Sequence, residues 1–147
     1  MGGDGVVTQE PMMLAGDMAR VGGSAVGVAE DLVGVLRSHI IRGQRETQIQ
    51  DGVEQVLRAA TRYEVVRECR LSAQDRPDFL VDGRVVIEVK MRASGSEVLW
   101  QLGRYAAHER VAAIVVASPR FSTLSRIPSM IHGVAVRVVG LSGAGLR

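Results

Sequence analysis

The sequence has a single cysteine, Cys69, among its 147 residues. One thiol cannot form a disulfide, a zinc cluster or a cysteine-ligated iron–sulfur cluster within one chain, so these frameworks are excluded. No apolar run approaches the roughly 18 residues needed to cross a bilayer, and the N-terminus lacks the basic and apolar segments of a secretory signal. From these absences we expect a cytoplasmic protein with no membrane partner.

Lysine is as scarce as cysteine. All but one of the 18 basic residues are arginine, and Lys90 is the only lysine. Such a bias is typical of a GC-rich genome, in which lysine drifts to arginine wherever a generic positive charge suffices. An ammonium group is a compact point charge whose pKa can shift, whereas a guanidinium is a planar fork that stays protonated. The single lysine therefore indicates that position 90 needs an ammonium group.

A formal net charge of +2 is too small by itself to indicate nucleic-acid binding. Residues 1–45 carry four arginines and five acidic residues, whereas residues 46–147 carry fourteen basic and eleven acidic residues. The second part is mildly basic and also holds several carboxylates. This combination suits a site that binds cations and contacts a phosphate backbone, although many enzymes share it.

The length is that of one domain, and 46% of the residues are hydrophobic, which is enough to form a core. Residues 1–24 lack periodicity and are expected to form a flexible N-terminal arm. Residues 25–45 are expected to form an accessory segment, with a packing or oligomerisation helix over 25–42. Residues 46–147 are expected to form a single domain that begins with a helix at 46–61.

The rest of this domain alternates between strand and helix patterns. Stretches rich in β-branched and apolar residues predict strands, and apolar residues at helical spacing predict helices. In chain order we expect strands at 63–71, 77–82 and 84–90, a helix at 95–109, a strand at 111–117, a helical or irregular piece near 120–131 and a strand at 134–139. Strand–helix–strand units imply parallel pairing, so the expected class is α/β, with a mixed β-sheet flanked by helices.

Three residues that suit metal-dependent hydrolysis occur in residues 76–90, RPDFLVDGRVVIEVK. Asp78 opens one predicted strand, and Glu88 and Lys90 close the next. Side chains two positions apart on a strand share a face, so Glu88 and Lys90 point the same way. Converging carboxylates repel each other unless a cation lies between them, and Mg²⁺ (or Mn²⁺) prefers oxygen ligands. A lysine beside such a centre can orient a nucleophilic water.

The register of the two strands decides whether Asp78 joins this face. Asp82 and Gly83 form a typical turn pair between the strands. A two-residue loop would pair Asp78 with Ile87, whereas a three-residue loop or a one-residue bulge would pair it with Glu88. We predict the second arrangement, because only this register brings the two carboxylates together.

The pattern PD-x₉-ExK, within a helix–β–β–β–helix–β order, resembles the PD-(D/E)xK nuclease superfamily, which has the fold of restriction endonucleases and Holliday-junction resolvases. The resemblance covers roughly residues 46–140. It implies a restriction-endonuclease-like fold and a DNA substrate. It also implies that Asp78, Glu88 and the backbone carbonyl of Val89 bind the metal, and that Lys90 assists the attacking water.

Members of this superfamily often carry a glutamate on the helix before the first strand. Glu46 and Glu54 both qualify. At 100° per residue, Glu46 projects within about 20° of Val53 and Leu57, on the apolar stripe, whereas Glu54 lies well off it. We therefore choose Glu46 as a fourth catalytic residue, with Glu54 in reserve. The alternative for Glu46 is an acidic residue favoured by the helix macrodipole.

Gln101 and Tyr105 lie at i and i+4 on the helix after Lys90, hence on one face. Their Q-x₃-Y pattern resembles the exonuclease branch of the superfamily, which includes lambda exonuclease and the nuclease domains of bacterial recombination complexes. In that branch these residues contact the DNA strand or brace the site. The basic residues close to the motif that could hold phosphates are Arg76, Arg92 and Arg104.

The resemblance predicts a Mg²⁺-dependent DNA nuclease for recombination, repair or DNA processing. The order of its motifs is similar to that of small phage-encoded members, which implies a bacterial or phage-infected host cell. The Q-x₃-Y pattern favours an exonuclease, whereas the small size favours a Holliday-junction or other structure-specific endonuclease. We expect a homo-oligomer in either case, since one small subunit offers little surface for gripping a duplex. An RNA nuclease and a non-catalytic DNA-binding module of the same fold remain alternatives.

Overall fold

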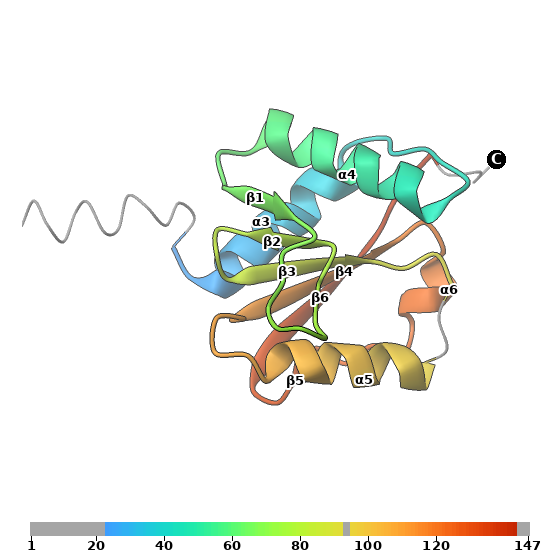
Figure 1. Cartoon of the computed structure of the whole chain (residues 1–147). Coiled ribbons are helices and arrows are strands. Elements are labelled where there is room, and N and C mark those ends of the chain that lie inside the picture. The colour runs from blue at the N-terminus through green and yellow to red at the C-terminus, as the bar shows by residue number, and fades with distance from the viewer. Residues whose placement is uncertain (1–22, 93–94, 144–147) are drawn as a thin grey trace, which may run out of the picture.

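The computed structural model describes residues 23–92 and 95–143. In this part of the chain a six-stranded mixed sheet lies between helices on its two faces (Figure 1), which confirms the predicted α/β class. The flexible arm expected over residues 1–24 lies outside the described residues except for its last two positions. Within the described ranges, every helix is too short or too polar to cross a membrane.

The sheet has the strand order β1-β2-β3-β4-β6-β5. The first three strands pair antiparallel, β4 and β6 continue the sheet in parallel with β3, and β5 returns antiparallel beside β6. The strands are β1 (Val65–Arg67), β2 (Phe79–Val81), β3 (Val85–Val89), β4 (Ala113–Ser118), β5 (Met130–Ile131) and β6 (Val134–Gly140).

Each face of the sheet has its own hydrophobic core, because successive side chains of a strand point to opposite faces. Phe79 and Ile87 belong to the core under α3 and α4, whereas Leu80 and Val86 belong to the core under α5 and α6. The helices are α3 (Ala25–Arg37), α4 (Glu46–Ala60), α5 (Gly95–Ala106) and α6 (Phe121–Leu124). Figure 1 shows α4 and α5 on opposite sides of the sheet.

Several elements are shorter than their sequence patterns predict. The strand expected over 63–71 ends at Arg67, because the next residue, Glu68, takes a left-handed conformation with φ 53°. The helix expected over 25–42 ends at Arg37. The apolar pattern continues to Ile40, but this residue forms an isolated parallel β-bridge with Ser142. The N–H of the next residue, Ile41, donates to the carbonyl oxygen of Ser142 at 3.0 Å.

The segment near 120–131 contains both kinds of structure. Only Phe121–Leu124 is helical, and Met130–Ile131 forms the edge strand β5, which the sequence pattern did not predict. Two residues are too few to show an alternation of apolar and polar positions. The strand is defined instead by its pairing with the beginning of β6.

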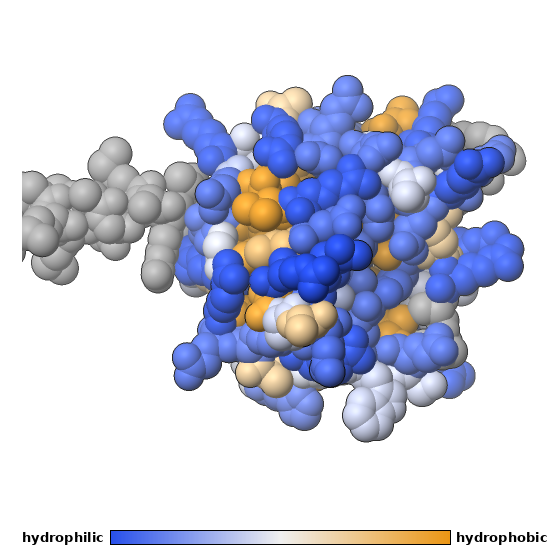
Figure 2. Space-filling view, in the orientation of Figure 1, coloured by the Kyte–Doolittle hydropathy of each residue, from blue (hydrophilic) through white to orange (hydrophobic). Residues whose placement is uncertain are grey.

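The helix α3 is an integral part of the fold. Its residues Val28, Ala29, Leu32 and Leu36 are fully buried in the same core as the inner face of the sheet. Of the two roles expected for this helix, packing within the chain is the one that its buried face serves. Figure 2 shows a mainly hydrophilic surface with small apolar patches, as expected when most large apolar side chains lie inside.

Replacement of Leu32 by alanine tests this role. Because the side chain is fully buried, we expect Leu32→Ala to lower the free energy of unfolding by about 3 kcal/mol, measured by urea denaturation. The matched control is Ile40→Ala, an aliphatic residue that is 63% exposed and should change the stability by less than about 0.5 kcal/mol. Equal effects of the two substitutions would contradict the packing role of α3.

Candidate active site

Asp78 and Glu88 lie opposite each other where β2 begins and β3 ends. Phe79 pairs with Ile87 in the ladder, so the next position along each chain places Asp78 opposite Glu88. Residues directly opposite in an antiparallel pair project to the same face. The register predicted from the sequence is therefore confirmed.

The turn between the two strands sets this register. Asp82 and Gly83 both have positive φ, 55° and 68°, and the Arg84 N–H donates to the Val81 carbonyl at 3.1 Å, as in a tight two-residue turn. The ladder partner of Val81 is nevertheless Val85, so Arg84 is one extra residue on the side of β3. This extra residue shifts the pairing by one position and brings Asp78 round to Glu88.

Direct contacts join the three predicted catalytic residues. The Asp78 N–H donates to Glu88 Oε1 at 3.1 Å, and the Val89 N–H donates to Asp78 Oδ2 at 2.7 Å. Lys90 Nζ lies 3.2 Å from Glu88 Oε2. The Glu88 side chain is 5% exposed and that of Lys90 19%, so the ion pair is largely shielded from water.

Burial disfavours the ionised form of both carboxyl groups. It raises the pKa of Glu88 to about 7, and the negative charge of Asp78 adds to this effect while Lys90 opposes it. Burial also raises the pKa of Asp78, although the hydrogen bond from the Val89 N–H works against the shift. A proton or a cation at this pair would relieve the cost of two buried, adjacent charges.

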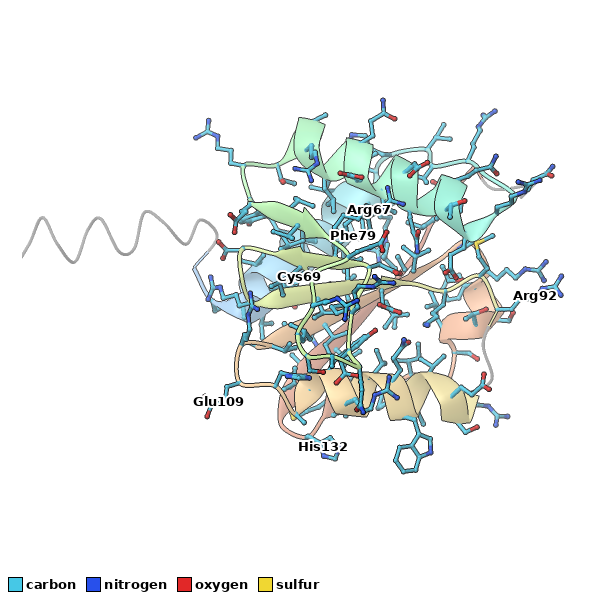
Figure 3. The ribbon with its side chains drawn as sticks, viewed as in Figure 1. Arg67, Cys69, Phe79, Arg92, Glu109 and His132 are labelled. Atoms are coloured by element: carbon cyan, nitrogen blue, oxygen red, sulfur yellow. The ribbon has the colours of Figure 1, made fainter. Side chains whose placement is uncertain are left out.

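Gln50 on α4 contacts the centre, and the sequence analysis missed it. Its Nε2 donates to Asp78 Oδ1 at 3.0 Å, while its Oε1 accepts from Arg67 Nη2 at 3.3 Å. Arg67 lies over the ring of Phe79, 5.9 Å from its centroid, and Figure 3 shows the two side chains between α4 and the sheet. Arg67 therefore fixes the amide so that its NH₂ group faces Asp78. Gln50 lies one helical turn after Glu46, and this spacing was the available signal.

The two glutamates considered on α4 have different environments. The expected position of Glu46 on the buried apolar stripe of α4 is wrong, because Glu46 is exposed at the first position of the helix. Its negative charge still contributes to the raised pKa of Asp78. Glu54 accepts hydrogen bonds from Arg67 and Arg58, both at 2.9 Å, and these hold its pKa below its usual range. Glu54 thus links α4 to β1 and to its own helix, whereas Glu46 lies at the margin of the centre.

The helix α5 covers the centre from the other face of the sheet. Tyr105 is 1% exposed, and its hydroxyl donates to Glu88 Oε1 at 3.4 Å. Burial and the charge of Glu88 raise the pKa of Tyr105, so the phenol keeps its proton. One turn earlier, Gln101 Oε1 is buried and accepts no hydrogen bond from the described residues. A buried acceptor without a partner costs about 1–3 kcal/mol, which a ligand with an N–H or O–H group would recover.

A cavity of about 440 Å³ opens between α5 and the end of β3. Its lining combines basic side chains with amide, apolar and aromatic ones: Lys90, Arg92, Glu97, Val98, Trp100, Gln101 and Arg104. Figure 3 shows Arg92 at the edge of the molecule, with its side chain directed outward. Two of the three arginines predicted to hold phosphates, Arg92 and Arg104, therefore lie beside Lys90.

Asp75, a second residue that the sequence analysis missed, positions Arg104. It is 7% exposed and accepts from Arg104 Nε at 2.8 Å and from His108 Nε2 at 2.9 Å. These two contacts hold the pKa of Asp75 below its usual range. Arg76, in contrast, forms an exposed ion pair with Glu68 at 3.7 Å and does not line the cavity beside Lys90.

The donor set fits a hard divalent cation. Within residues 23–92 and 95–143, no group of three or more His, Cys, Asp and Glu side chains is placed to hold a metal. Asp78 and Glu88 supply two carboxylates, a set that Mg²⁺ commonly completes with waters and substrate phosphates. The Val89 N–H points toward the side of β2, where it binds Asp78. Continuing the register of β2 and β3, the residue opposite Val89 is Pro77, and a proline has no N–H to donate to the Val89 carbonyl. That carbonyl is therefore available as a third oxygen ligand.

No protein-family model, no curated protein and no solved structure matches this chain. A functional assignment therefore depends on the chemistry of the centre itself.

The raised pKa of Glu88 predicts a pH-dependent stability for the metal-free protein. The folded state binds the proton of Glu88 more tightly than the unfolded state does. The contribution of this proton to the free energy of unfolding is therefore complete below about pH 4.5 and is lost as the pH rises through about 7. We expect Glu88→Gln to stabilise the protein relative to wild type at pH 8, by about 3 kcal/mol, and to have little effect at pH 4.5, measured by urea denaturation in EDTA.

The matched control for this prediction is Glu109→Gln. Glu109 is exposed, and Figure 3 places it on the opposite side of the molecule from Arg92. Its substitution should leave the pH profile unchanged. A profile for Glu88→Gln that runs parallel to the wild-type profile would contradict the raised pKa.

Proposed function

We propose that this protein is a Mg²⁺-dependent nuclease of the PD-(D/E)xK type that hydrolyses DNA phosphodiester bonds. The observation that carries the proposal is the placement of Asp78 opposite Glu88, with Lys90 bound to the same carboxylate. Two adjacent carboxylates, one buried and one half-buried, destabilise a protein unless they serve a cation, and an ammonium group beside them suits attack on a phosphate.

The residues have distinct roles in this proposal. Asp78, Glu88 and the Val89 carbonyl would hold one cation, which when bound supplies Lewis acidity toward the phosphate and favours ionisation of a water. Lys90 orients that water through its Nζ and offsets negative charge on the phosphate. Because its partner atom is Glu88 Oε2, the ammonium is held at the carboxylate rather than left in solvent.

Side chains from both helical layers restrict the two carboxylates. Gln50 binds Asp78 Oδ1 from α4, and Tyr105 binds Glu88 Oε1 from α5. Such contacts behind metal ligands fix their orientation, and their loss commonly reduces metal affinity or activity about 10–100-fold. Glu46 adds negative charge near Asp78, so its proposed contribution is electrostatic.

Arg92, Arg104 and Gln101 would bind the DNA strand next to the centre. They line one cavity with Lys90, and Asp75 holds Arg104 in place. The resemblance of the Q-x₃-Y pattern of Gln101 and Tyr105 to the exonuclease branch favours processing from DNA ends in recombination or repair, and the Tyr105 hydroxyl contacts Glu88. Two alternatives to end processing are cleavage of a four-way junction by a homo-oligomer and DNA binding without turnover. Cleavage assays separate these alternatives from end processing.

Cleavage assays test the chemistry directly. We expect the wild-type protein to degrade linear DNA in Mg²⁺ and to leave closed circular DNA intact. Asp78→Asn, Glu88→Gln and Lys90→Ala should each lower kcat at least about 100-fold, because each removes a charge from the centre. EDTA should abolish cleavage.

Glu109→Gln is the control, because it removes an exposed carboxylate from the far side of the molecule. Equal rates for wild type, Lys90→Ala and Asp78→Asn would overturn the proposed centre, and cleavage that persists in EDTA would remove the metal from the mechanism. Cutting of closed circles or of four-way junctions would instead identify an endonuclease.

Metal binding should also be visible without substrate. Because the ligands must be ionised, Mg²⁺ should raise the melting temperature more at pH 8 than at pH 5, where Glu88 keeps its proton. Differential scanning fluorimetry of the wild type and of Asp78→Asn measures this, and the variant should lose the Mg²⁺-dependent shift. A shift of equal size in both proteins would place the cation elsewhere.

A further inference from the structure

Trp100 is the only tryptophan of the chain, and 75% of it is exposed to solvent. It lies on α5 one turn before Arg104 and next to Gln101. Burying a large aromatic side chain is strongly favourable, so a position that leaves most of the ring in water requires an explanation.

The surroundings of the ring indicate which molecule would cover it. Trp100 lines the 440 Å³ cavity together with Lys90, Arg92 and Arg104. The lining thus combines three cationic groups and one carboxylate, that of Glu97, with an exposed aromatic ring. Proteins that bind single-stranded nucleic acid use cations to contact the phosphates and an aromatic ring to stack on a base. A purely apolar partner would not require these charges.

The cavity also connects the ring to the proposed catalytic centre. Lys90 lines it and contacts Glu88, and Gln101, which lines the same cavity, carries a buried oxygen that accepts no hydrogen bond from the described residues. A strand with one phosphate at Lys90 would therefore reach the aromatic ring within the same cavity.

We propose that Trp100 stacks on an unpaired nucleobase of the substrate strand, so that the site takes single-stranded or frayed DNA in preference to intact duplex. This inference rests on the proposed nuclease function. In a closed duplex both faces of a base are covered by its neighbours, whereas an unpaired base can leave the stack and offer a face to the ring. Stacking of this kind tolerates every base, which predicts selectivity for strand structure rather than for sequence.

The single tryptophan makes binding directly measurable. We expect the fluorescence of the full chain to be quenched by a single-stranded oligothymidylate in EDTA, where no cleavage occurs, and much less by a blunt hairpin duplex at equal nucleotide concentration. Trp100→Ala should weaken oligothymidylate binding about tenfold, measured by fluorescence anisotropy of a labelled strand, and Trp100→Phe should restore most of it.

Leu99→Ala provides the matched control. Leu99 is the neighbouring residue, 40% exposed, and it lines a groove of about 560 Å³ that also includes Trp100 and Arg104, but it does not line the cavity of Lys90. Its substitution should leave strand binding unchanged. In Mg²⁺, Trp100→Ala should raise KM for single-stranded DNA about tenfold and change kcat by less than about threefold.

The results separate this inference from the proposed function. If the protein cleaves DNA but its tryptophan fluorescence is not quenched, the stacking role is overturned and the nuclease assignment stands. An unchanged KM for single-stranded DNA in Trp100→Ala would have the same meaning. Quenching without cleavage would support the stacking role and overturn the enzymatic assignment. Two other results would overturn the inference and assign this face to a protein partner or a second copy. One is an equal loss of oligothymidylate binding in Leu99→Ala and Trp100→Ala, and the other is a tryptophan fluorescence that changes on dilution without DNA.

Discussion

Two adjacent carboxyl groups, a buried one on Glu88 and a half-buried one on Asp78, form the constraint on which the rest of the centre depends. Asp78 and Glu88 can occupy it because backbone N–H groups, Lys90 and two side-chain donors surround their oxygens. That arrangement in turn requires the exact pairing of β2 with β3, since a slip of one residue would turn one carboxylate to the other face. The extra residue of the turn, Arg84, thus has its effect at the opposite end of the hairpin.

The two cores of the molecule hold that pairing in place. Along β2 and β3, alternate residues belong to the core of α3 and α4 and to the core of α5 and α6. Because both faces of these strands are buried, a shift in register would exchange their side chains between the two cores and disrupt the packing of both. The stability of the fold therefore supports a centre that is itself destabilising, and the Gln101 oxygen, which lacks a hydrogen-bond donor within the described part of the chain, adds to that local cost.

The features that sequence patterns predicted are those determined by nearby residues. The α/β class and the main helices follow from periodicity. The turn at Asp82 and Gly83 left two registers open, and the one observed was predicted because it brings Asp78 and Glu88 together. Features that depend on distant partners were missed. The end of α3 is set by pairing near Ser142, and β5 exists only through its partner β6. Gln50 and Asp75 reach the site through contacts with residues 28 and 29 positions away, which spacing along the chain cannot reveal.

The scarcity of lysine has a practical consequence for chemistry on this molecule. Among the side chains of the whole sequence, only Lys90 presents a primary amine. Reagents that acylate or alkylate amines, which label most proteins at many surface positions, would meet here one side chain and the N-terminus. Because that side chain is 19% exposed and paired with Glu88, its reactivity depends on whether the ion pair is intact. A general protein-labelling reaction thus becomes, in this chain, a selective readout of the centre.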